Sequence, residues 1–377
     1  MKLKVRVHGR HPWFYRKMIQ RPAERIPAGS AVRVVDRAGK PVGTGFYNSR
    51  TDLALRMLDR ARVDDPDAFL LDRLDAAIHL RHEVLGLPEV TNGYRIVHSE
   101  GDGFPGIVID RLGDAIVAQL FSLCMQQRAE PIGERLLERF PGSRMVLTVD
   151  ETAKSREGME TPPRGKPFVV DVEEHGLHYA VRPGQDHKTG FFADQRDARM
   201  RVRELARGRT VLDLCCNSGG FALNASVGGA KRVVGFDLDE GVVAQAAENA
   251  KRNRRDVRFE HGDAFDVLRD AKDGAYDLIV LDPPKWIRGK EEVEVGERRY
   301  QDLNQLAFRK VARGGIVVTC SCSGALGEPR FLSILTEAAA IARRDARILH
   351  VGGAGPDHPV ALECPQTRYL KVATLAF

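Results

Sequence analysis

The sequence predicts an α/β protein whose C-terminal half is a doubly wound, Rossmann-like sheet of seven mostly parallel strands. From Thr210 onward, apolar runs typical of buried strands alternate with helical segments. Residues 1 to about 68 instead hold short strands between Gly/Pro turns, a pattern typical of a small β-barrel. The chain has 377 residues, too many for one ordinary core. We therefore expect three domains: a small barrel over 1–68, an α+β domain over 69–178 and the doubly wound domain over 179–377.

The N-terminal segment combines its strands with an excess of positive charge. Its strands "KLKVRV", "AVRVVD" and "TDLALRML" are separated by the turn sequences "IPAGS" and "AGKPVGTG". Residues 1–60 carry 14 Lys and Arg against 4 acidic residues, so this segment has a charge of +10 and the remainder has −4. Such asymmetry indicates a basic module that meets a polyanion, although an Arg-rich solvated surface would have the same composition.

The central segment mixes helical and strand patterns. From Asp65, "DPDAFLLDRLDAAIHLRHEVLGL" places apolar residues at helical spacing. Two or three strands follow in "YRIVHSEGDGFPGIVIDRLGDAIVAQLFS", and a helix is expected near Met125 to Phe140. The strand "RMVLTVD", the polar loop "ETAKSREGMETPPRGKP" and the hairpin "FVVDVEEHGLHYAVRP" complete this part.

Seven apolar runs predict the strands of the C-terminal domain. They are "TVLDLCC", "RVVGFDL", "VRFEHGD", "YDLIVLDPP", "GIVVTCSCS", "ARILHV" and "YLKVATLAF". In a doubly wound sheet, the ligand crevice lies at the carboxyl ends of the strands. The residues that end these runs are therefore the first candidates for a binding site.

The first of these strands runs into "DLCCNSGGFAL". Gly219 and Gly220 allow the backbone to approach a ligand closely as a helix begins, which is how adenosine-containing cofactors are held. The stretch has no GxGxxG, so it gives little support for a bound pyrophosphate.

Acidic residues close the first four strands of this domain. Asp237 follows Asp213 by 24 residues, where a carboxylate can accept hydrogen bonds from both ribose hydroxyls. Asp263 could meet the adenine amino group, and Asp282 ends the fourth strand. This much negative charge favours a cationic, phosphate-free ligand, and S-adenosylmethionine, with its sulfonium and ammonium groups, fits. Any single one of these aspartates could instead be a helix N-cap.

The six cysteines show no CxxC pair and no spaced Cys/His quartet, so neither a zinc ribbon nor a disulfide framework is expected. Cys320 and Cys322 alone would leave a metal short of two ligands. The N-terminal "MKLKVRVHGRHPW" has no apolar signal segment, and no run of about 18 apolar residues occurs, so a cytoplasmic protein without membrane insertion is expected.

Motifs spread along the whole chain resemble those of the RlmI-type 23S rRNA cytosine-C5 methyltransferases, a group of class I S-adenosylmethionine-dependent methyltransferases. "GRHPWFYRKMI" and "GTGFYNSRTDLALRML" resemble their N-terminal PUA domain, and "HSEGDGFPGIVID" resembles their central domain. "KTGFFADQRDAR" resembles the segment that leads into their catalytic domain, and "LDPPKW", "SCSG" and "DHPV" complete the pattern. The resemblance implies S-adenosylmethionine as cofactor and 23S rRNA as partner.

The resemblance also implies a set of cofactor-binding residues. Family members usually have an aromatic residue where this chain has Asn217. The implied residues are Phe192, Asp194, Gln195, Asp213, Asn217, Gly219, Asp237, Asp263 and Asp282.

Methylation of cytosine C5 requires a nucleophile, because C5 becomes reactive only after a thiolate has added to C6. A cysteine at the end of the fifth strand is well placed, and Cys322 is the last before the turn. Cys322 is therefore the expected nucleophile, in agreement with the family element "SCSG", and Cys320 is expected to be packing. Asp282 is the candidate for protonating or hydrogen-bonding cytosine N3. The sequence does not identify the base that removes the C5 proton.

Cationic and aromatic side chains alternate near the N-terminus, as stacking on unpaired bases would require. Trp13 and the adjoining Phe14 could equally hold the small barrel against its neighbour. The RNA-binding candidates are Arg10, His11 and Trp13, with Phe14 and Tyr15 beside them, and Lys285, with Trp286, next to the target base.

Three other functions remain compatible with the sequence. A methyltransferase acting on a guanine or adenine nitrogen would need no thiolate, and a catalytically silent RNA-binding or assembly protein would need only the fold. An NAD-dependent dehydrogenase is disfavoured because GxGxxG is absent. The sequence leaves the oligomeric state open, a homodimer included.

Overall fold

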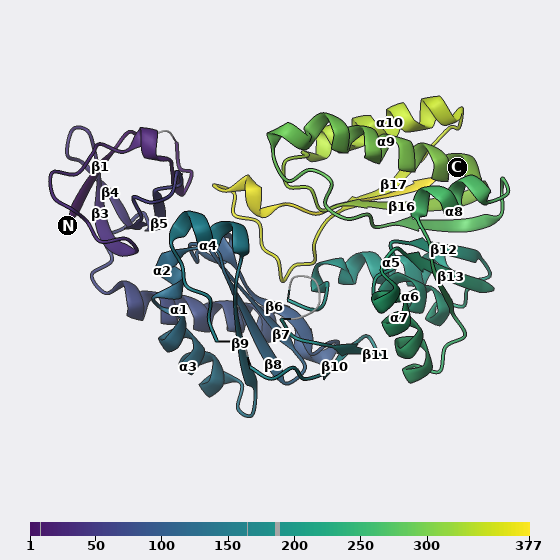
Figure 1. Ribbon diagram of the computed structural model, residues 1–377, viewed down its shortest axis with the longest axis horizontal. Coiled ribbons are helices and arrows are strands. Elements are labelled where there is room, and N and C mark those ends of the chain that lie inside the picture. Colours follow the sequence, from purple (N-terminus) through teal and green to yellow (C-terminus); the bar gives the residue numbers. More distant parts are fainter. Residues whose placement is uncertain (8, 164, 185–188) are drawn as a thin grey trace. The chain divides into compact units, whose positions relative to one another are not determined.

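The computed structural model describes residues 1–7, 9–163, 165–184 and 189–377 (Figure 1). Lys188, the first residue of the "KTGFFADQRDAR" motif, lies outside the described residues. The chain divides into two compact units. The first comprises Met1–His175, Val181–Ala193 and Pro356–Thr367, and the second comprises Gly176–Ala180, Asp194–Gly355 and Arg368–Phe377. The domain boundaries expected at 68/69 and 178/179 stay predictions.

The first unit begins with a five-stranded sheet whose order is β1-β3-β4-β5-β2. Its strands are β1 (Lys2–Val5), β2 (Trp13–Phe14), β3 (Ser30–Asp36), β4 (Pro41–Tyr47) and β5 (Leu55–Asp59). The expectation that "AGKPVGTG" is a turn was wrong, because most of it lies in β4. A Cβ on Gly45 would lie 2.7 Å from the carbonyl oxygen of Arg56 on β5, so this glycine permits close strand pairing.

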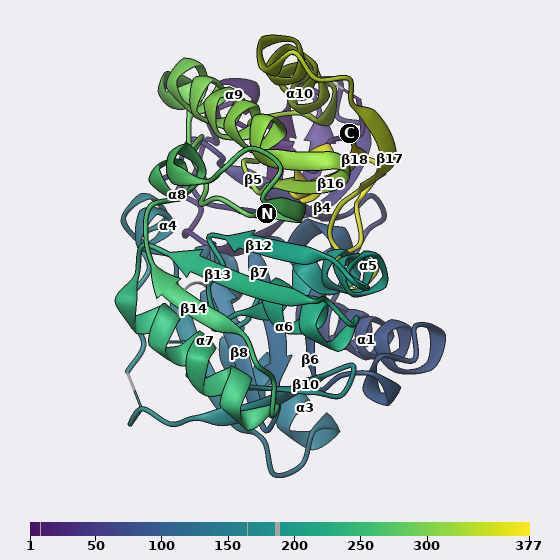
Figure 2. The ribbon, with the colours of Figure 1, turned by 90° about the vertical axis from the view of Figure 1, so that its right-hand side faces the viewer.

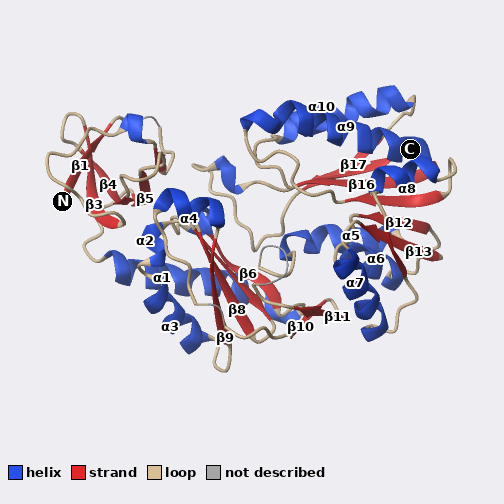
Figure 3. Ribbon diagram, viewed as in Figure 1, coloured by secondary structure: helices blue, strands red, loops and turns tan. Residues whose placement is uncertain are grey.

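The first unit continues with a four-stranded sheet of order β6-β7-β8-β9, which lies beside helices (Figure 3). Buried side chains of this sheet and of the helices form one core. The strands are β6 (Gly93–His98), β7 (Ile107–Leu112), β8 (Ala115–Leu120) and β9 (Arg144–Val149), and the helices are α1 (Pro66–His79), α2 (Leu123–Gln126), α3 (Ala129–Arg139) and α4 (Glu151–Glu157).

Two helix predictions in this part need correction. The helix expected near Met125 to Phe140 is interrupted between α2 and α3. The expected polar loop after β9 begins with α4, which has local signals at both ends: Asp150 accepts a hydrogen bond from the Ala153 amide, and Gly158 follows in the left-handed region. The chain then passes to the second unit between β10 (Val170–Glu174) and β11 (Leu177–Val181).

The second unit contains a seven-stranded sheet with the order β14-β13-β12-β15-β16-β18-β17. Strands β12 to β16 run parallel, and β18 is antiparallel to both of its neighbours. All seven predicted strands are confirmed: β12 (Thr210–Leu214), β13 (Arg232–Asp237), β14 (Arg258–His261), β15 (Tyr276–Leu281), β16 (Val311–Ser321), β17 (Arg347–Gly352) and β18 (Lys371–Ala376).

Helices cover both faces of this sheet (Figure 2). Buried residues of α8, α9 and α10 form one core with the sheet, and those of α5 and α6 form another on its opposite face. The helices are α5 (Arg196–Leu205), α6 (Gly220–Val227), α7 (Glu240–Arg252), α8 (Ala264–Asp270), α9 (Val293–Lys310) and α10 (Glu328–Ala342). This arrangement leaves the carboxyl edge of the parallel strands to loops, as a doubly wound sheet requires.

Short 3₁₀ helices, and a π-helix at η2, complete the secondary structure of the described residues. They are η1 (Arg16–Met18), η2 (Leu80–Val84), η3 (Leu87–Glu89), η4 (Ser99–Asp102), η5 (Ala193–Gln195), η6 (Lys290–Glu292) and η7 (Pro365–Thr367). Among the described residues, no helix combines the length and the apolar character needed to span a membrane.

Candidate active site

The carboxyl ends of the central strands are joined by backbone hydrogen bonds, which bring the strand-end residues to one edge of the sheet. The strand order reverses direction at β12, which lies between β13 and β15. The Asp282 amide donates to the Leu214 carbonyl at 3.3 Å, and the Cys216 amide donates to the Phe236 carbonyl at 3.0 Å. This edge is therefore the topological switch point at which doubly wound sheets bind ligands.

Asp213, the second-last residue of β12, is buried beneath this edge and does not lie on its surface. Its side chain is fully buried, and its Oδ2 accepts a hydrogen bond from the Ala222 amide in α6 at 2.9 Å. Its Oδ1 is buried without a hydrogen-bond partner among the described residues. Burial raises the pKa of Asp213 well above its usual range, and the charges of Asp282 and Asp237 add to this effect. Burial thus disfavours the ionised form of Asp213, and its carboxyl group supports the start of α6.

The loop from β12 to α6 turns through residues with positive φ. Cys215 has φ +60°, Asn217 has +46° and Gly219 has +85°. Asparagine adopts this conformation more readily than most residues. The Asn217 amide donates to Asp237 Oδ2 at 2.9 Å, and its side-chain oxygen accepts from the Ser218 amide at 2.8 Å. These contacts explain an asparagine at the position where the sequence departs from the family pattern.

Glycine is required at the end of this loop. A Cβ on Gly219 would lie 2.7 Å from the ring of Phe259. Together with its positive φ, this close approach excludes larger residues where α6 begins.

Asp237 and Asp263 both receive backbone hydrogen bonds. Asp237, half-buried at the end of β13, accepts from Asn217 and also from the Asp239 amide at 3.1 Å. Asp263 is the N-cap of α8 and accepts from Phe265 at 2.8 Å. The helix-cap interpretation thus describes Asp263, and its carboxylate retains lone pairs for a further donor.

A second group of polar side chains links the start of α5 to β15 and β16. The side-chain Nε2 of Gln195 donates to Asp282 Oδ1 at 2.9 Å, and the side-chain Oε1 of Gln195 lies 4.0 Å from Cys320 Sγ. The Tyr369 hydroxyl donates to Asp194 Oδ2. The structure therefore brings Asp194, Gln195 and Asp282 into the same unit, while Phe192 belongs to the first unit.

The two cysteines of "SCSG" differ in accessibility. Cys320 lies within β16, is fully buried, and burial raises its thiol pKa well above the ordinary range. Cys322 is only half-buried and follows the last residue of β16. Of the two, Cys322 is the thiol that a substrate at the carboxyl edge could reach.

Hydrogen bonds fix the loop that carries Cys322. Ser323 Oγ accepts from the Ile287 amide at 3.1 Å and lies 3.0 Å from the Tyr300 hydroxyl. The side chain of Lys371 donates to the Ser323 carbonyl at 2.6 Å. Sequence reasoning missed these three supporting side chains. A lysine in the apolar strand "YLKVATLAF" was the available signal.

Lys285 and Trp286, expected near the target base, have different surroundings. Lys285 is exposed. The Trp286 ring packs against Tyr300 with centroids 4.8 Å apart, and the Arg299 guanidinium lies 5.8 Å from its centre. Trp286 is thus part of the packing on α9, whereas Lys285 projects from the loop after β15.

The N-terminal RNA-binding candidates have partners within the first unit. Trp13 Nε1 donates to Glu100 Oε1 at 2.8 Å, and Arg56 donates to the same oxygen at 2.9 Å. The Arg10 side chain forms an ion pair with Glu363. These contacts support the interpretation in which Trp13 holds the barrel against its neighbour, and the RNA-binding role stays a prediction.

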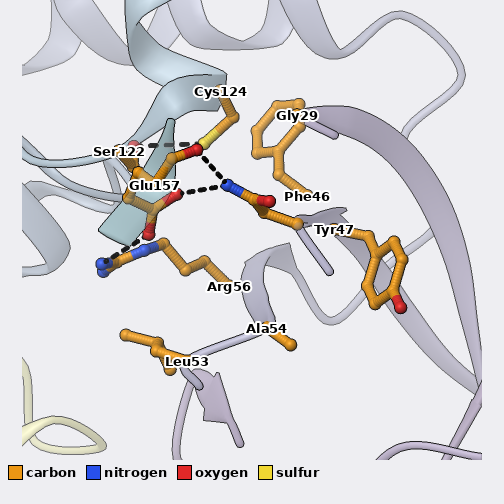
Figure 4. Close-up of a pocket in the computed structure, with 10 residues that line it drawn as sticks. Gly29, Phe46, Tyr47, Leu53, Ala54, Arg56, Ser122, Cys124 and Glu157 are labelled. Atoms are coloured by element: carbon orange, nitrogen blue, oxygen red, sulfur yellow. Dashed lines mark hydrogen bonds and ion pairs between the residues drawn. The ribbon is translucent and has the colours of Figure 1, made fainter. Parts of the chain in front are cut away.

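His11 and the residues that line a pocket in the first unit also contact other residues of that unit. His11 Nε2 lies 2.9 Å from Gln366 Oε1. The pocket in Figure 4 joins β4 and β5 to α4: Asn48 Nδ2 donates to Glu157 Oε2 at 2.8 Å, and Arg56 lies 3.7 Å from Glu157 Oε1. Polar pairs therefore connect the barrel to the rest of the first unit.

The "DHPV" motif lies in the first unit as well. Asp357 Oδ2 accepts from the Arg95 amide at 3.0 Å, and the Asp357 carbonyl accepts from Arg81 at 2.6 Å. His358 Nδ1 lies 3.0 Å from Asp357 Oδ1. All of these side chains are buried or nearly so, which indicates a role in holding the segment Pro356–Thr367 in place.

Curated relatives match the chain along nearly its full length. Ribosomal RNA large subunit methyltransferase I of Aeromonas hydrophila is 34% identical over 378 residues, covering 96% of this chain and 94% of the relative. The protein of that name from Escherichia coli SMS-3-5 is 32% identical over 373 residues, with the same coverage. This chain belongs to the ribosomal RNA large subunit methyltransferase I family. The resemblance seen in the sequence is thereby confirmed.

Family and structure comparisons agree with this membership. The S-adenosylmethionine-dependent methyltransferase family matches residues 159–359, and the PUA-like domain family matches residues 2–60. The methyltransferase SMU.776, solved in complex with SAH, has a TM-score of 0.83 and 19% identity, with full coverage of both chains. Trm5b from Pyrococcus abyssi has a TM-score of 0.52 and 16% identity, over 71% of this chain and 74% of its own. The expected α/β fold with a PUA-like N-terminal domain is confirmed.

Membership of this family makes S-adenosylmethionine the cofactor, as the sequence predicted. The residues at the carboxyl edge of β12 and β13 fit it chemically. Carboxyl groups there suit a cationic ligand, and the buried Asp213 Oδ1 has an unused hydrogen-bonding site.

Proposed function

We propose that this member of the family transfers a methyl group from S-adenosylmethionine to C5 of a cytosine in 23S rRNA, through a covalent adduct of Cys322 with C6. The names of the curated relatives support ribosomal RNA of the large subunit as substrate. The observation that carries the thiol mechanism is the position of Cys322: it is half-buried, directly after β16, while Cys320 is fully buried one pleat earlier. A nucleophile must be accessible to its substrate, and Cys322 alone of the pair meets this condition.

In the proposed reaction, the protein's side chains first form the covalent adduct with cytosine and, after methyl transfer, release it. The Cys322 thiolate adds to cytosine C6, which makes C5 nucleophilic, and Asp282 in its protonated form donates a hydrogen bond to N3, where negative charge develops. The cofactor supplies the electrophilic methyl group. Removal of the C5 proton then allows the C6–S bond to break and restores the Cys322 thiolate. Gln195 Nε2 donates to Asp282 Oδ1 at 2.9 Å and so fixes the orientation of this carboxyl group.

Different residues would hold different parts of the cofactor. Asp237 is the expected acceptor for the ribose hydroxyls, Asp263 for the adenine amino group, and Asp213 supports the α6 terminus from below. The full proposed set is Phe192, Asp194, Gln195, Asp213, Asn217, Gly219, Asp237, Asp263 and Asp282. For RNA, Lys285 is the proposed phosphate or base contact in the second unit, with Arg10, His11 and Trp13 in the PUA-like domain.

Product analysis tests this proposal. The purified protein is incubated with S-adenosylmethionine carrying a labelled methyl group and with 23S rRNA from cells that lack the gene, and the RNA is digested to nucleosides. We expect the label in 5-methylcytidine. Label in an N-methylated guanosine or adenosine would contradict the thiol mechanism and favour a base-nitrogen methyltransferase. Bound cofactor without transfer to any nucleoside would favour a silent RNA-binding protein.

A further inference from the structure

Lys371 is a buried lysine beside the loop that carries Cys322. It is the first residue of β18 and pairs across the strands with Ser321, the last residue of β16. It is 2% exposed, and its Nζ donates to the carbonyl oxygens of Ser323 at 2.6 Å and of Tyr369 at 2.8 Å. Burial of a lysine is costly unless its charge is compensated, so this position calls for an explanation.

The surroundings of Lys371 provide only partial compensation. Within the described part of the chain, two neutral carbonyl groups accept its hydrogen bonds and no carboxylate does so. An ammonium group has three N–H donors, and two are used. Burial lowers the pKa of Lys371 to about 8, and the negative form of Cys322 is the strongest of the influences that raise it.

Several other titratable groups act on this pair. Lys285 from the loop after β15 and Arg368 lower the pKa of Lys371, and Glu328 from the start of α10 raises it. Tyr300 from α9 has its pKa raised to about 12 by burial, so it stays a neutral phenol near neutral pH. Cys320, on the same strand as Cys322, is buried and its pKa is raised well above the ordinary range. Among the described residues, Lys285, Arg368 and Glu328 therefore act on Lys371, while Tyr300 and Cys320 interact with Cys322.

We propose that Lys371 is the positioning residue of the attacking thiol: its ammonium group, fixed between the Ser323 and Tyr369 carbonyls, is the counter-ion of the Cys322 thiolate. In the activation step the S–H bond of Cys322 breaks, the proton passes to water, and the electron pair remains on sulfur beside the ammonium group. A fixed positive charge near a thiol favours the thiolate. The carbonyl contacts also hold the loop, so Lys371 sets both the charge and the place of the nucleophile.

A purely structural lysine would explain the carbonyl contacts but not an effect on the thiol. The measurement that separates the two roles is therefore the reactivity of the Cys322 thiol. Lys371→Met removes the charge and keeps a side chain of similar length. Lys310→Met is the matched control, because Lys310, the last residue of α9, also donates through Nζ to a backbone carbonyl, that of Ala271 at 2.7 Å.

The experiment measures alkylation of the folded, full-length protein by iodoacetamide from pH 6 to 10. The rate for Cys322 is obtained by subtracting the rate of Cys322→Ala. We expect Lys371→Met to lower the alkylation rate of Cys322 at pH 7 about tenfold. The midpoint of the curve of rate against pH should rise by about one pH unit, since one pKa unit is a tenfold change in thiolate fraction. Lys371→Arg keeps the charge and should retain most of the reactivity. Lys310→Met should match the unmodified protein.

An unchanged midpoint in Lys371→Met would overturn the proposal. If that variant does not fold, Lys371→Gln, which keeps a donor for the Ser323 carbonyl, is held to the same criterion. The proposal rests on the assignment of Cys322 as nucleophile in the proposed function. Alkylation uses neither RNA nor cofactor, so an unchanged midpoint leaves the proposed function standing, whereas failure to form 5-methylcytidine leaves the alkylation result intact.

Discussion

Two strand ends of the same sheet each carry a thiol, and different charged side chains act on the two. At the end of β12, burial raises the pKa of Cys215 far above its ordinary value, and the charges of four aspartates add to this effect. At the end of β16, Cys322 is half-buried and lies close enough to the buried Lys371 for their charges to interact. One thiol is therefore kept protonated, while the other has a cation beside it.

This difference divides the carboxyl edge of the sheet into two functional halves. Carboxylates around β12 and β13 suit a cationic cofactor and suppress a thiolate that would compete for it. Lysines around β16 suit a thiolate nucleophile and an RNA phosphate. The proposed thiol mechanism needs both, because a positive methyl donor must lie next to a negative attacking group.

The largest expected effect is at the nucleophile. Cys322→Ala should lower the rate of methyl transfer by about 10⁴-fold or more, because removal of a covalent nucleophile leaves only binding and positioning. Cys215→Ala, at the other strand end, should keep most of the activity. Transfer of labelled methyl groups to rRNA measures both variants. Equal losses in the two would remove the distinction between the halves.

The part of the edge around β12 and β13, which we call the acidic half because it carries the carboxylates, is tested through cofactor affinity. Asp237→Asn should weaken S-adenosylmethionine binding about tenfold or more, since a hydrogen bond to a charged acceptor is lost. Asp239→Asn is the matched control, because Asp239 is an exposed neighbour that only caps α7. Calorimetric titration without RNA gives both affinities, and equal affinities for the two variants would argue against a ribose contact at Asp237.

The part of the edge around β16, which we call the basic half because it carries Lys285 and Lys371, is tested through RNA affinity. Lys285→Ala should weaken rRNA-fragment binding a few-fold and reduce the slope of log affinity against log salt by about one, as expected for one phosphate contact. Its S-adenosylmethionine affinity should not change. Lys310→Ala, whose lysine pairs with Asp273 at 3.0 Å, should leave the salt slope as it is. A reduced cofactor affinity in Lys285→Ala would show that the two halves are not separate.

The smallest expected effect concerns the buried carboxyl of the acidic half. The folded-state pKa of Asp213 is raised, so the folded protein binds the proton more tightly than the unfolded chain. Its contribution to stability is complete below the unfolded pKa and is lost as pH rises through the folded pKa. Asp213→Asn should remove this loss and make the free energy of unfolding less dependent on pH above about 4. Urea unfolding at a series of pH values measures it, and an unchanged pH dependence would mean that Asp213 is ionised in the fold.

Much of this edge could be predicted from the sequence, because buried parallel strands are short apolar runs and the residues that follow them meet at one edge. That reasoning placed Asp237, Asp282 and Cys322 at the ends of their strands. It missed most of β4, because Gly43 and Gly45 are of a residue type that indicates a turn, although they permit close strand pairing.

Other features depend on contacts between distant parts of the chain. The Lys371 side chain meets the Ser323 carbonyl 48 residues away, and no local pattern encodes that contact. The burial of Asp213 under α6 likewise follows from packing and not from its place at a strand end.

The most direct test of the account is covalent trapping with rRNA that contains 5-fluorocytosine, because fluorine at C5 prevents release of the adduct. The unmodified protein and Cys320→Ala should form a complex with this RNA that survives denaturing electrophoresis, and Cys322→Ala should form none. A stable complex in Cys322→Ala, together with its loss in Cys320→Ala, would contradict the assignment of Cys322 as the attacking thiol.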